Sequence, residues 1–492
     1  MFRLSKRILA IDPWVLRPLD FVNNNNQAIV ASAGPIVKMT YATTGKLGWN
    51  RRAIHRGRVC WSSRTSAPDN RDRRKQEEEE KKTSSTFISH LKNPIVHQLW
   101  TRRQQAKANP SLLADPSKPR SPSQSHIEIS YPFSTDEFLK ETYRNPWGQM
   151  RFGKILEDLD ALAGNIAFAH VQDPQLNIVT ASVDRIRLRR PPNLESDQHL
   201  QGKVTYVGTS SMEIRMQCIN EGDEWMEAYF TFVATDPVTK RPMKIPPLTP
   251  ESPLEQKYFD AGQRRAQVKK EARKRSTNKT AAAMHGGMMT DPHIEAMAQD
   301  LLAKAGPLIN MPSLADPHSI LMSATRLQNA EIAQPQVRNL ANQIFGGFLM
   351  RRAFELAYAT AYVFGGARPR FLELDEVSFQ SPVDVGDLSV FHSRVLYTSV
   401  MEQGEELHFD AVKGPNVPLV TVQVEAWIAE PEKASARISN QFYFTFFLPN
   451  NTPVRTVLPS NIDEARRMAV RMAADEAQRQ EDQQEYYAGN QK

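Results

Sequence analysis

The sequence predicts an α+β protein in which one domain, built from a single long helix and an antiparallel sheet, occurs twice. The first observation is a motif, Arg144-Asn145 followed by Gly153 at the start of an apolar helical pattern, which recurs 194 residues later as Arg338-Asn339 followed by Gly347. The second is a shared closing tetrad, Tyr229-Phe-Thr-Phe232 and Tyr443-Phe-Thr-Phe446. A repeat this long is a whole domain rather than a solenoid unit, which spans roughly 20 to 50 residues.

The first copy spans about residues 127–260. The alternating run His126–Tyr131 predicts a strand, and the apolar spacing of Ile155–His170 predicts one helix. Further strands are expected at Ile178–Leu188, Gly202–Val207, Met212–Cys218 and Glu227–Thr235. Thr249-Pro250 begins another helix, which we expect to dissolve into the basic segment that follows.

The second copy spans about residues 318–450, with a helix at Gly347–Phe364 and insertions between its strands. Strands are expected at Met322–Ala333, Phe371–Phe379, Leu388–Tyr397, His408–Val412, Leu419–Ala429 and Gln441–Leu448. A sheet with one helix on a single face is an α+β arrangement. A helix that is mostly apolar has to be wrapped, and a curved antiparallel sheet can do so.

The remaining segments are tails and linkers. Residues 1–68 hold eleven Arg and Lys but two acids, a composition typical of a mitochondrial presequence, with a disordered basic tail as the alternative. Residues 69–126 are expected to form a charged, Pro- and Ser-rich linker, and 261–317 a basic helix followed by a flexible linker over 276–312. Residues 451–492 are expected to form a charged C-terminal tail with a helix at Ile462–Tyr487.

Composition and motifs exclude several classes of protein. No stretch approaches the ~18 uncharged apolar residues of a membrane-spanning helix. The two cysteines cannot form a disulfide framework, and no Cys/His cluster indicates a zinc site. The nucleophile elbow, the phosphate-binding loop and the HExxH metal motif are absent from the sequence. We therefore expect neither a metal nor a cofactor.

One acidic residue stands out on the first helix. With 100° per residue, the apolar side chains from Ile155 to His170 fill one arc, and Asp160 falls at its edge, while Glu157, Asp158 and Asn165 fall opposite. Asp160 is either a boundary carboxylate that reaches water or a carboxylate held in a half-dry pocket to act on water or substrate.

The second helix aligns with the first without gaps and carries Phe354 where the first has Asp160. Its nearest acid, Glu355, is rotated by about 100° toward the polar face. If the two copies pair face to face, two related pockets result. One combines Asp160 with the Asn339 loop, and the other combines Asn145 with Phe354 and Glu355; the first alone has an inward carboxylate.

Gly346-Gly347 opens the second helix. Paired glycines there let backbone approach a ligand closely, and the free N–H groups of a helix N-terminus can receive a developing oxyanion. The alternative is tight packing of this helix against the sheet.

At this point the sequence resembles a known family, the hotdog-fold acyl-coenzyme A thioesterases, and in particular the mitochondrial thioesterase 9-type proteins with two hotdog domains in one chain. The resemblance covers roughly residues 126–450. It is carried by Arg151–Asp160, Asn177–Asp184, Tyr206–Glu213, Pro250–Pro253, Asn342–Met350, Gly365–Pro369 and Phe379–Gly386.

The resemblance implies two hotdog domains pairing into a pseudo-dimer that hydrolyses acyl-CoA to a free acid and CoA. It implies that Asp160 is a general base or nucleophile and that Asn339 orients water or the thioester. Gly346 and Gly347 would bind the oxyanion, and Arg338 the CoA phosphates, with Arg351 and Arg352 as further candidates. Asn145 and Glu355 would form a degenerate second site. It also implies a protein of the mitochondrial matrix that assembles into homo-oligomers without inserting into a membrane.

Three alternatives stay open. A hotdog hydratase would need an Asp and a His close together, and Asp291-Pro-His293 and Asp316-Pro-His318 lie in the expected linker. A non-catalytic acyl-CoA-binding protein would explain a pocket without an inward acid. Nucleic-acid binding would use the basic segments, but these lack interleaved aromatic residues, so we expect no nucleic-acid partner.

Overall fold

The computed structural model describes residues 117–283, 291–339, 343–375, 377–401 and 416–490, together with positions 101, 105 and 115. All elements below belong to one compact unit, Asp69–Lys492. The expected presequence, most of the expected 69–126 linker and the strand expected at His408–Val412 lie outside the described residues.

The first domain has the expected helix and strands. Helix α4 (Phe152–Val171) is the long helix. The strands are β1 (Ile127–Tyr131), β2 (Asn177–Leu188), β3 (Gln198–Val207), β4 (Ser211–Asn220) and β5 (Asp223–Thr235). A short helix, α3 (Glu137–Tyr143), was not expected because seven residues are too few to show a helical period. Asp136 caps it, its side chain accepting from the Leu139 N–H at 2.9 Å.

The second domain repeats the plan with two corrections. Its elements are α7 (Gly346–Gly365), β7 (Leu327–Ile332), β8 (Arg370–Leu374), β9 (Val377–Phe379), β10 (Leu388–Met401), β11 (Val417–Glu430) and β12 (Ser435–Phe447). The strand expected from Met322 begins at Leu327, because Met322–Thr325 is a 3₁₀ turn closed by the Thr325 hydroxyl. The strand expected at Phe371–Phe379 is broken in two beside Asp375.

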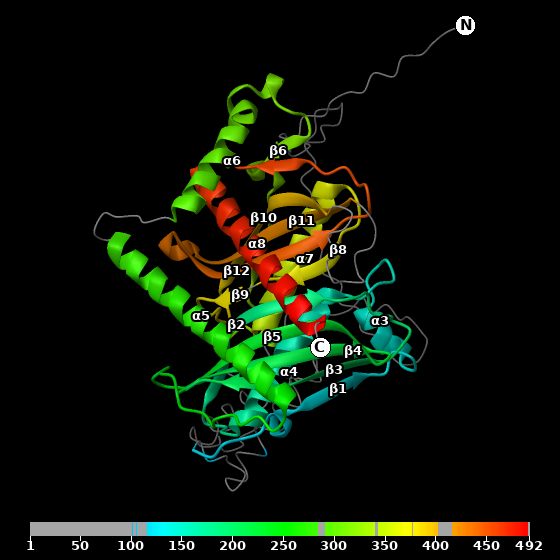
Figure 1. Ribbon diagram of the computed structural model, residues 1–492, viewed down its shortest axis with the longest axis vertical. Helices are drawn as coiled ribbons and strands as arrows, with labels where there is room; N and C mark the ends of the chain where they lie inside the picture. The colour runs from blue at the N-terminus through cyan, green and yellow to red at the C-terminus, as the bar shows by residue number, and fades with distance from the viewer. Residues whose placement is uncertain are drawn as a thin grey trace, which may run out of the picture. The chain divides into compact units, whose positions relative to one another are not determined.

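The two domains share one sheet. Its order is β1-β3-β4-β5-β2-β8-β12-β11-β10-β7, with β9 pairing β12 and β2, so the second half mirrors the first (Figure 1). Strands β2 and β8 join the halves in antiparallel pairing, with Ile186 opposite Leu374. Each half wraps its own helix, and together they form two hotdog domains paired as a pseudo-dimer.

The segment after the first domain is helical rather than flexible. Helix α5 (Pro253–Ala283) continues through the basic run, and α6 (Pro292–Asn310) occupies most of the expected flexible 276–312 segment. Asp291 caps α6, and its buried face of Ala298, Leu301 and Ala305 lies toward α8 (Ile462–Asn490). Over α6 the expectation of a flexible linker was wrong, because the buried face of this helix consists of a few, mostly small side chains; residues 284–290 of the expected linker lie outside the described residues. Two short parallel strands, β6 (Ser319–Leu321) and β13 (Thr456–Leu458), were also not expected.

Helices α5 and α8 lie across the outer face of the sheet, one on each domain (Figure 1). Arg265 of α5 pairs with Glu213 and stacks over Tyr229 of the first tetrad. On the second domain, α8 makes the equivalent contacts: Arg467 pairs with Glu425, and Arg471 lies over Tyr443. Each helix also pairs with an Asp of the sheet, Lys269 of α5 with Asp184 and Arg471 of α8 with Asp375. The repeated Asp and Tyr residues therefore anchor these helices.

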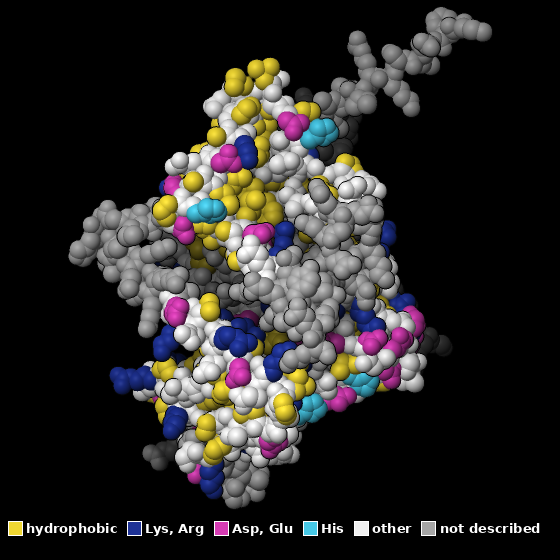
Figure 2. Space-filling view, in the orientation of Figure 1, with side chains coloured by type: hydrophobic (Ala, Val, Ile, Leu, Met, Phe, Trp, Pro, Cys, Tyr) yellow, Lys and Arg dark blue, Asp and Glu magenta, His cyan; other side chains and the backbone are white. Residues whose placement is uncertain are grey.

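This arrangement also accounts for basic residues that the nucleic-acid alternative would use. Arg265 and Lys269 are both engaged by acids of the sheet. Over the described part of the face in Figure 2, basic and acidic side chains are interspersed rather than gathered by sign.

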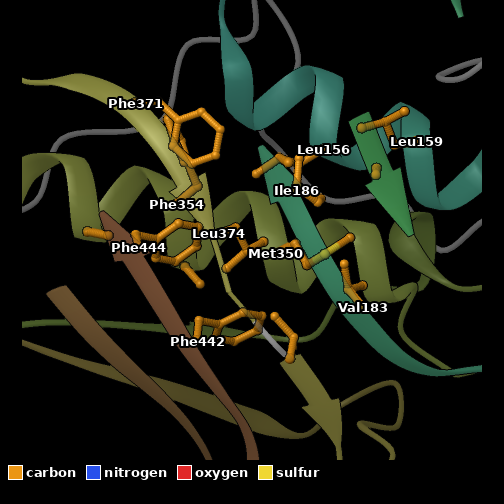
Figure 3. Packing of buried hydrophobic residues seen from close by; sticks show 14 of the residues in the cluster. Leu156, Leu159, Val183, Ile186, Met350, Phe354, Phe371, Leu374, Phe442 and Phe444 are labelled. Atoms are coloured by element: carbon orange, nitrogen blue, oxygen red, sulfur yellow. The ribbon is translucent and has the colours of Figure 1, made fainter. Parts of the chain in front are cut away.

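The two long helices contact each other through their first turns. A Cβ on Gly347 would lie 2.9 Å from the Cα and the carbonyl oxygen of Glu157, whereas a Cβ on Gly153 would lie 3.3 Å from the Arg351 and Phe354 side chains. Figure 3 shows the core beside this contact, where Leu156 and Leu159 of α4 and Met350 and Phe354 of α7 meet strands from both domains. This close contact fixes the position of one long helix relative to the other.

Gly347→Ala should therefore lower the free energy of unfolding by on the order of 1–3 kcal/mol, because its Cβ meets backbone that cannot move aside. Gly153→Ala should cost less, since the flexible Arg351 side chain can give way. Urea denaturation of both variants measures this. Gly306→Ala, which meets open space within α6, is the control and should be neutral or stabilising. Equal losses at Gly347 and Gly153 would contradict the asymmetry.

Candidate active site

A cavity of about 380 Å³ lies where the start of α7 meets α4 and β2. Its walls come from both domains, and include Asp160, Thr180 and Phe232 of the first and Asn339, Gly346 and Phe379 of the second. The pocket expected to combine Asp160 with the Asn339 loop is therefore present in the structure.

Asp160 is the buried carboxylate of this cavity, with 1% of its surface exposed. Its Oδ1 accepts from the Thr180 hydroxyl at 2.9 Å, and its Oδ2 accepts from the backbone N–H of Gly347 at 2.7 Å. Burial raises the pKa of Asp160 to about 6. The two hydrogen bonds lower this pKa, and the negative charge of Glu157 raises it by a smaller amount. The group is thus poised to exchange a proton near neutral pH.

The Gly346-Gly347 pair packs closely, as the alternative expectation had it, but Gly347 packs against the other long helix rather than against the sheet. A Cβ on Gly346 would lie 3.0 Å from the Phe379 ring and 3.2 Å from Asp160 Oδ2, so this position lets the carboxylate approach the helix end. Gly347 provides the close contact between helices, and its N–H binds the protein's own carboxylate rather than standing open to an oxyanion. Gly347 is not among the residues that line the cavity, whereas Gly346 is.

The two asparagines organise equivalent loops. Asn339 Oδ1 accepts from the Gln343 N–H at 3.1 Å, and Asn145 Oδ1 accepts from the Gln149 N–H at 2.9 Å. The backbone pairs in the same way, from Asn339 N to Gln343 O and from Asn145 N to Gln149 O. Each asparagine is therefore bound to the residue four positions later, just before a long helix, and each lines a cavity.

A second cavity of about 410 Å³ lies at the related position, lined by Asn145, Phe354 and Glu355. Phe354 occupies the place of Asp160 and contacts Phe371 at a ring separation of 5.5 Å. Although burial alone would raise it, the pKa of Glu355 is held below its ordinary value by Arg351, Arg352 and Arg151. Glu355 is therefore an ion-pair residue, unsuited to act as a base near neutral pH.

The arginines expected to meet CoA phosphates are not in the first cavity. Arg351 pairs with Glu157 at 3.0 Å and Glu355 at 3.1 Å, and Arg352 pairs with Glu331 at 2.8 Å. Arg338 is half-buried and is not among the lining residues. The cation that does line this cavity, among the described residues, is the exposed Lys240.

Two polar residues assigned to the exposed side of the first helix are buried instead. Asp158 accepts from the hydroxyls of Tyr131 and Tyr143 and pairs with Lys154, while Asn165 donates to the Ala161 carbonyl. The expectation was wrong because α4 is covered on its other side by β1 and α3. Burial raises the pKa of Asp158, but this carboxylate is enclosed by its partners and lines no part of the cavity.

Thr180 was missed at the level of sequence. Its hydroxyl is placed by β2 opposite α4, a contact between segments 20 residues apart that no local spacing reveals. Only the presence of Thr180 beside the apolar residues Ile178 and Val179 could have indicated its role from the sequence. The Asp–His pairs required by a hydratase have other roles: Asp291 and Asp316 accept from the backbone N–H groups of His293 and His318.

The described residues show neither a metal-binding cluster nor a membrane-spanning helix. They contain no group of three or more His, Cys, Asp or Glu side chains that could hold a metal ion. Within the same residues, every helix is too short or too polar to cross a bilayer.

Comparison with known proteins identifies the family. Acyl-coenzyme A thioesterase 2, chloroplastic, of Humulus lupulus is 41% identical over 78% of this chain and 89% of its own length. Acyl-coenzyme A thioesterase 9, mitochondrial, of Homo sapiens is 34% identical over 70% of this chain and 76% of its own length. The chain belongs to the acyl-coenzyme A thioesterase family. No family model matches the chain.

Solved structures give a weaker likeness to this thioesterase. An acyl-ACP thioesterase from Bacteroides thetaiotaomicron VPI-5482 matches 66% of this chain and 100% of its own, with 12% identity and a TM-score of 0.37.

Asp160→Asn should stabilise the protein at pH 8 while leaving stability near pH 3 unchanged. The raised pKa means that the buried charge costs stability above about pH 6, whereas below the ordinary value of 3.8 both folded and unfolded forms are protonated. A pKa difference of about two units corresponds to on the order of 3 kcal/mol. Denaturation at the two pH values measures the gain. Asp158→Asn is the matched control. It should be destabilising despite the raised pKa of Asp158, because an amide NH₂ would have to face either the Lys154 ammonium or the two tyrosine hydroxyls that donate to Asp158. Lower stability of Asp160→Asn at pH 8 would contradict this account.

Proposed function

We propose that this protein hydrolyses fatty acyl-CoA to a free fatty acid and CoA in the cavity shared by its two domains. The observation that carries the proposal is the contact of Asp160, from the first domain, with the Gly347 N–H of the second, inside a cavity that also holds Asn339. The family supports the chemistry, because the relatives are named as acyl-coenzyme A thioesterases.

The reaction we propose is attack of water on the thioester carbonyl. Asp160 takes a proton from the water as the C–O bond forms, giving a tetrahedral oxyanion. Collapse of this intermediate breaks the C–S bond, and the proton passes to the CoA thiolate, which is a good leaving group. Direct attack by Asp160, through an anhydride that water then opens, has the same overall balance. Thr180 and the Gly347 N–H fix the carboxylate in both cases.

Asn339 and Gly346 are the groups we assign to the carbonyl. Both line the cavity beside Asp160. The Gly346 N–H is at the first turn of α7 and has no acceptor among the described residues, so it can donate to the oxyanion in place of Gly347. We assign the Asn339 carboxamide to the thioester or the attacking water because Asn339 lines the cavity and an amide can donate as well as accept hydrogen bonds.

The walls suit the two ends of the substrate. Phe168, Phe232 and Leu349 give an apolar surface for the acyl chain. Lys240 offers a positive charge to the CoA phosphates, replacing Arg338 in that role. The mitochondrial relatives and the basic composition of residues 1–68 support a place in the mitochondrial matrix, and assembly of such chains into homo-oligomers belongs to the same proposal.

Asp160→Asn should lower kcat/KM for palmitoyl-CoA by about 10²–10⁴-fold, because the base is removed while its hydrogen-bonding shape is kept. Free CoA release, followed by thiol titration, measures this. A variant that retained the wild-type rate would exclude Asp160 as the base. Loss of activity with unchanged binding would also exclude a non-catalytic acyl-CoA-binding protein, since that protein would release no CoA in its wild-type form.

Asn339→Ala should lower kcat/KM by about 10²–10³-fold, the usual effect of losing one oxyanion donor. Asn145→Ala removes the equivalent loop contact from the other domain and should retain most of the activity. The same CoA-release assay compares them. Equal losses would indicate that both asparagines act through loop structure alone.

Activity should fall as the pH drops through about 6, because protonated Asp160 cannot accept a proton from water, and should level off above that value. Glu157→Gln should move this acidic limb to lower pH, since the Glu157 charge contributes to raising the pKa of Asp160. Profiles of kcat/KM from pH 5 to 8 measure both. A profile that is flat across this range would contradict the assignment.

A further inference from the structure

The second cavity is as large as the first, although it has lost the residues for hydrolysis. The two volumes are about 410 and about 380 Å³. Protein interiors are close-packed, with few voids larger than a water molecule. If the second cavity had no ligand, we would expect larger side chains to occupy its volume completely. This one has gained larger side chains and still remains open.

The replacements follow the repeat. Positions 194 residues apart on the two helices exchange Asp160 for Phe354 and Gly164 for Tyr358, and both members of each pair line their cavities. On the joining strands, Phe371 lines the second cavity where Thr180 lines the first. Each change replaces a polar or small residue by an aromatic ring. At these three positions the wall of the second cavity is therefore more apolar than that of the first, as suits a hydrocarbon chain.

The aromatic wall extends toward the mouth. Trp147 stacks on Tyr358 at a ring separation of 5.7 Å and is itself only half-buried. The guanidinium of Arg368 lies 5.3 Å from the centre of the Trp147 ring. Such a platform exposes apolar surface on one side and cationic charge on the other.

Two cations at this mouth have no carboxylate partner among the described residues. Arg370 lines the cavity and is exposed, and Arg368 contacts the Trp147 ring. The third cation of the wall, Arg151, is paired with Glu355 at 3.3 Å. Unpaired guanidinium groups beside an apolar pocket match a ligand with a hydrocarbon chain and an anionic head.

We infer that the second cavity binds a long acyl chain with an anionic head group, either fatty acyl-CoA or the fatty acid, and holds it without hydrolysis. The chain lies against Phe354, Tyr358 and Phe371, and the head group lies beside Arg370 and Arg368. Phe354 replaces Asp160 there. The two carboxylates among the described lining residues, Glu355 and Glu195, are held in ion pairs and are therefore unsuited to act as a base on a bound thioester. The inference takes its ligand class from the proposed function, but its test measures binding rather than turnover.

The test is titration calorimetry with S-hexadecyl-CoA, a thioether that cannot be hydrolysed, used below its micelle concentration. The full chain should bind two molecules. Arg370→Glu should weaken one binding event by about tenfold or more, because it reverses a charge that meets the anionic head. The matched variant Lys240→Glu, which changes the lining cation of the first cavity, should weaken the other event. A single event, lost in Lys240→Glu and intact in Arg370→Glu, would overturn the inference.

Fluorescence assigns the second event to its cavity. Trp147 lines the second cavity, and no tryptophan is among the described residues lining the first. A thioether with a brominated acyl chain should quench Trp147, and Trp147→Phe should remove that quenching. Two binding events without it would place the second molecule elsewhere and overturn the inference.

Palmitate and CoA alone distinguish the two sources of the head group. Palmitate binding that is sensitive to Arg370→Glu identifies the fatty acid as a ligand, whereas binding of the thioether alone identifies acyl-CoA. Binding of CoA without a chain at this cavity would overturn the role of the aromatic wall. The proposed function fails separately, on hydrolysis that survives in Asp160→Asn.

Discussion

The hydrogen bond from the Gly347 N–H to the Asp160 carboxylate is the interaction on which the rest of the site depends. It crosses between domains, and it exists because glycine at 346 and 347 lets α7 come within contact distance of α4. Burial of the carboxylate at this contact raises the pKa of Asp160 to about 6, although the hydrogen bond itself lowers that pKa. A single close approach therefore joins the domains, orients the base and sets its proton affinity.

Buried carboxylates on one helix can have opposite roles, and their surroundings decide which. Asp158 and Asp160 are two residues apart and equally hidden. Asp158 is enclosed by two tyrosine hydroxyls and Lys154, so it ties α4 to β1 and α3. Asp160 has one hydroxyl and one N–H for partners and faces a cavity. The two carboxylates differ because Asp160 faces the cavity, which leaves room for a reacting molecule, whereas Asp158 does not line it.

The pseudo-dimer makes two sites from one plan and has let them diverge. Both keep an asparagine-closed loop against a helix start. The acid survives on α4 alone, and on α7 its place belongs to an aromatic cluster around Phe354. Because the duplicated halves lie in one chain, each position can change independently, which identical subunits do not allow. The contacts of the outer helices, in contrast, are the same in both halves, since Arg265 and Arg471 lie over equivalent tyrosines.

The sequence by itself determined the repeat, the one-helix domain and the exchange of Asp160 for Phe354, because these are patterns of local spacing and of alignment between two copies. It also predicted which cavity would hold the inward acid. The tertiary structure alone decided that Thr180 and Gly347 bind that acid, that Asp158 is buried and that Arg351 serves an ion pair rather than a phosphate. It likewise revealed α6 in a segment expected to be flexible. Each of these depends on a surface contributed by a distant segment, and the period of a helix or strand carries no information about what will cover it.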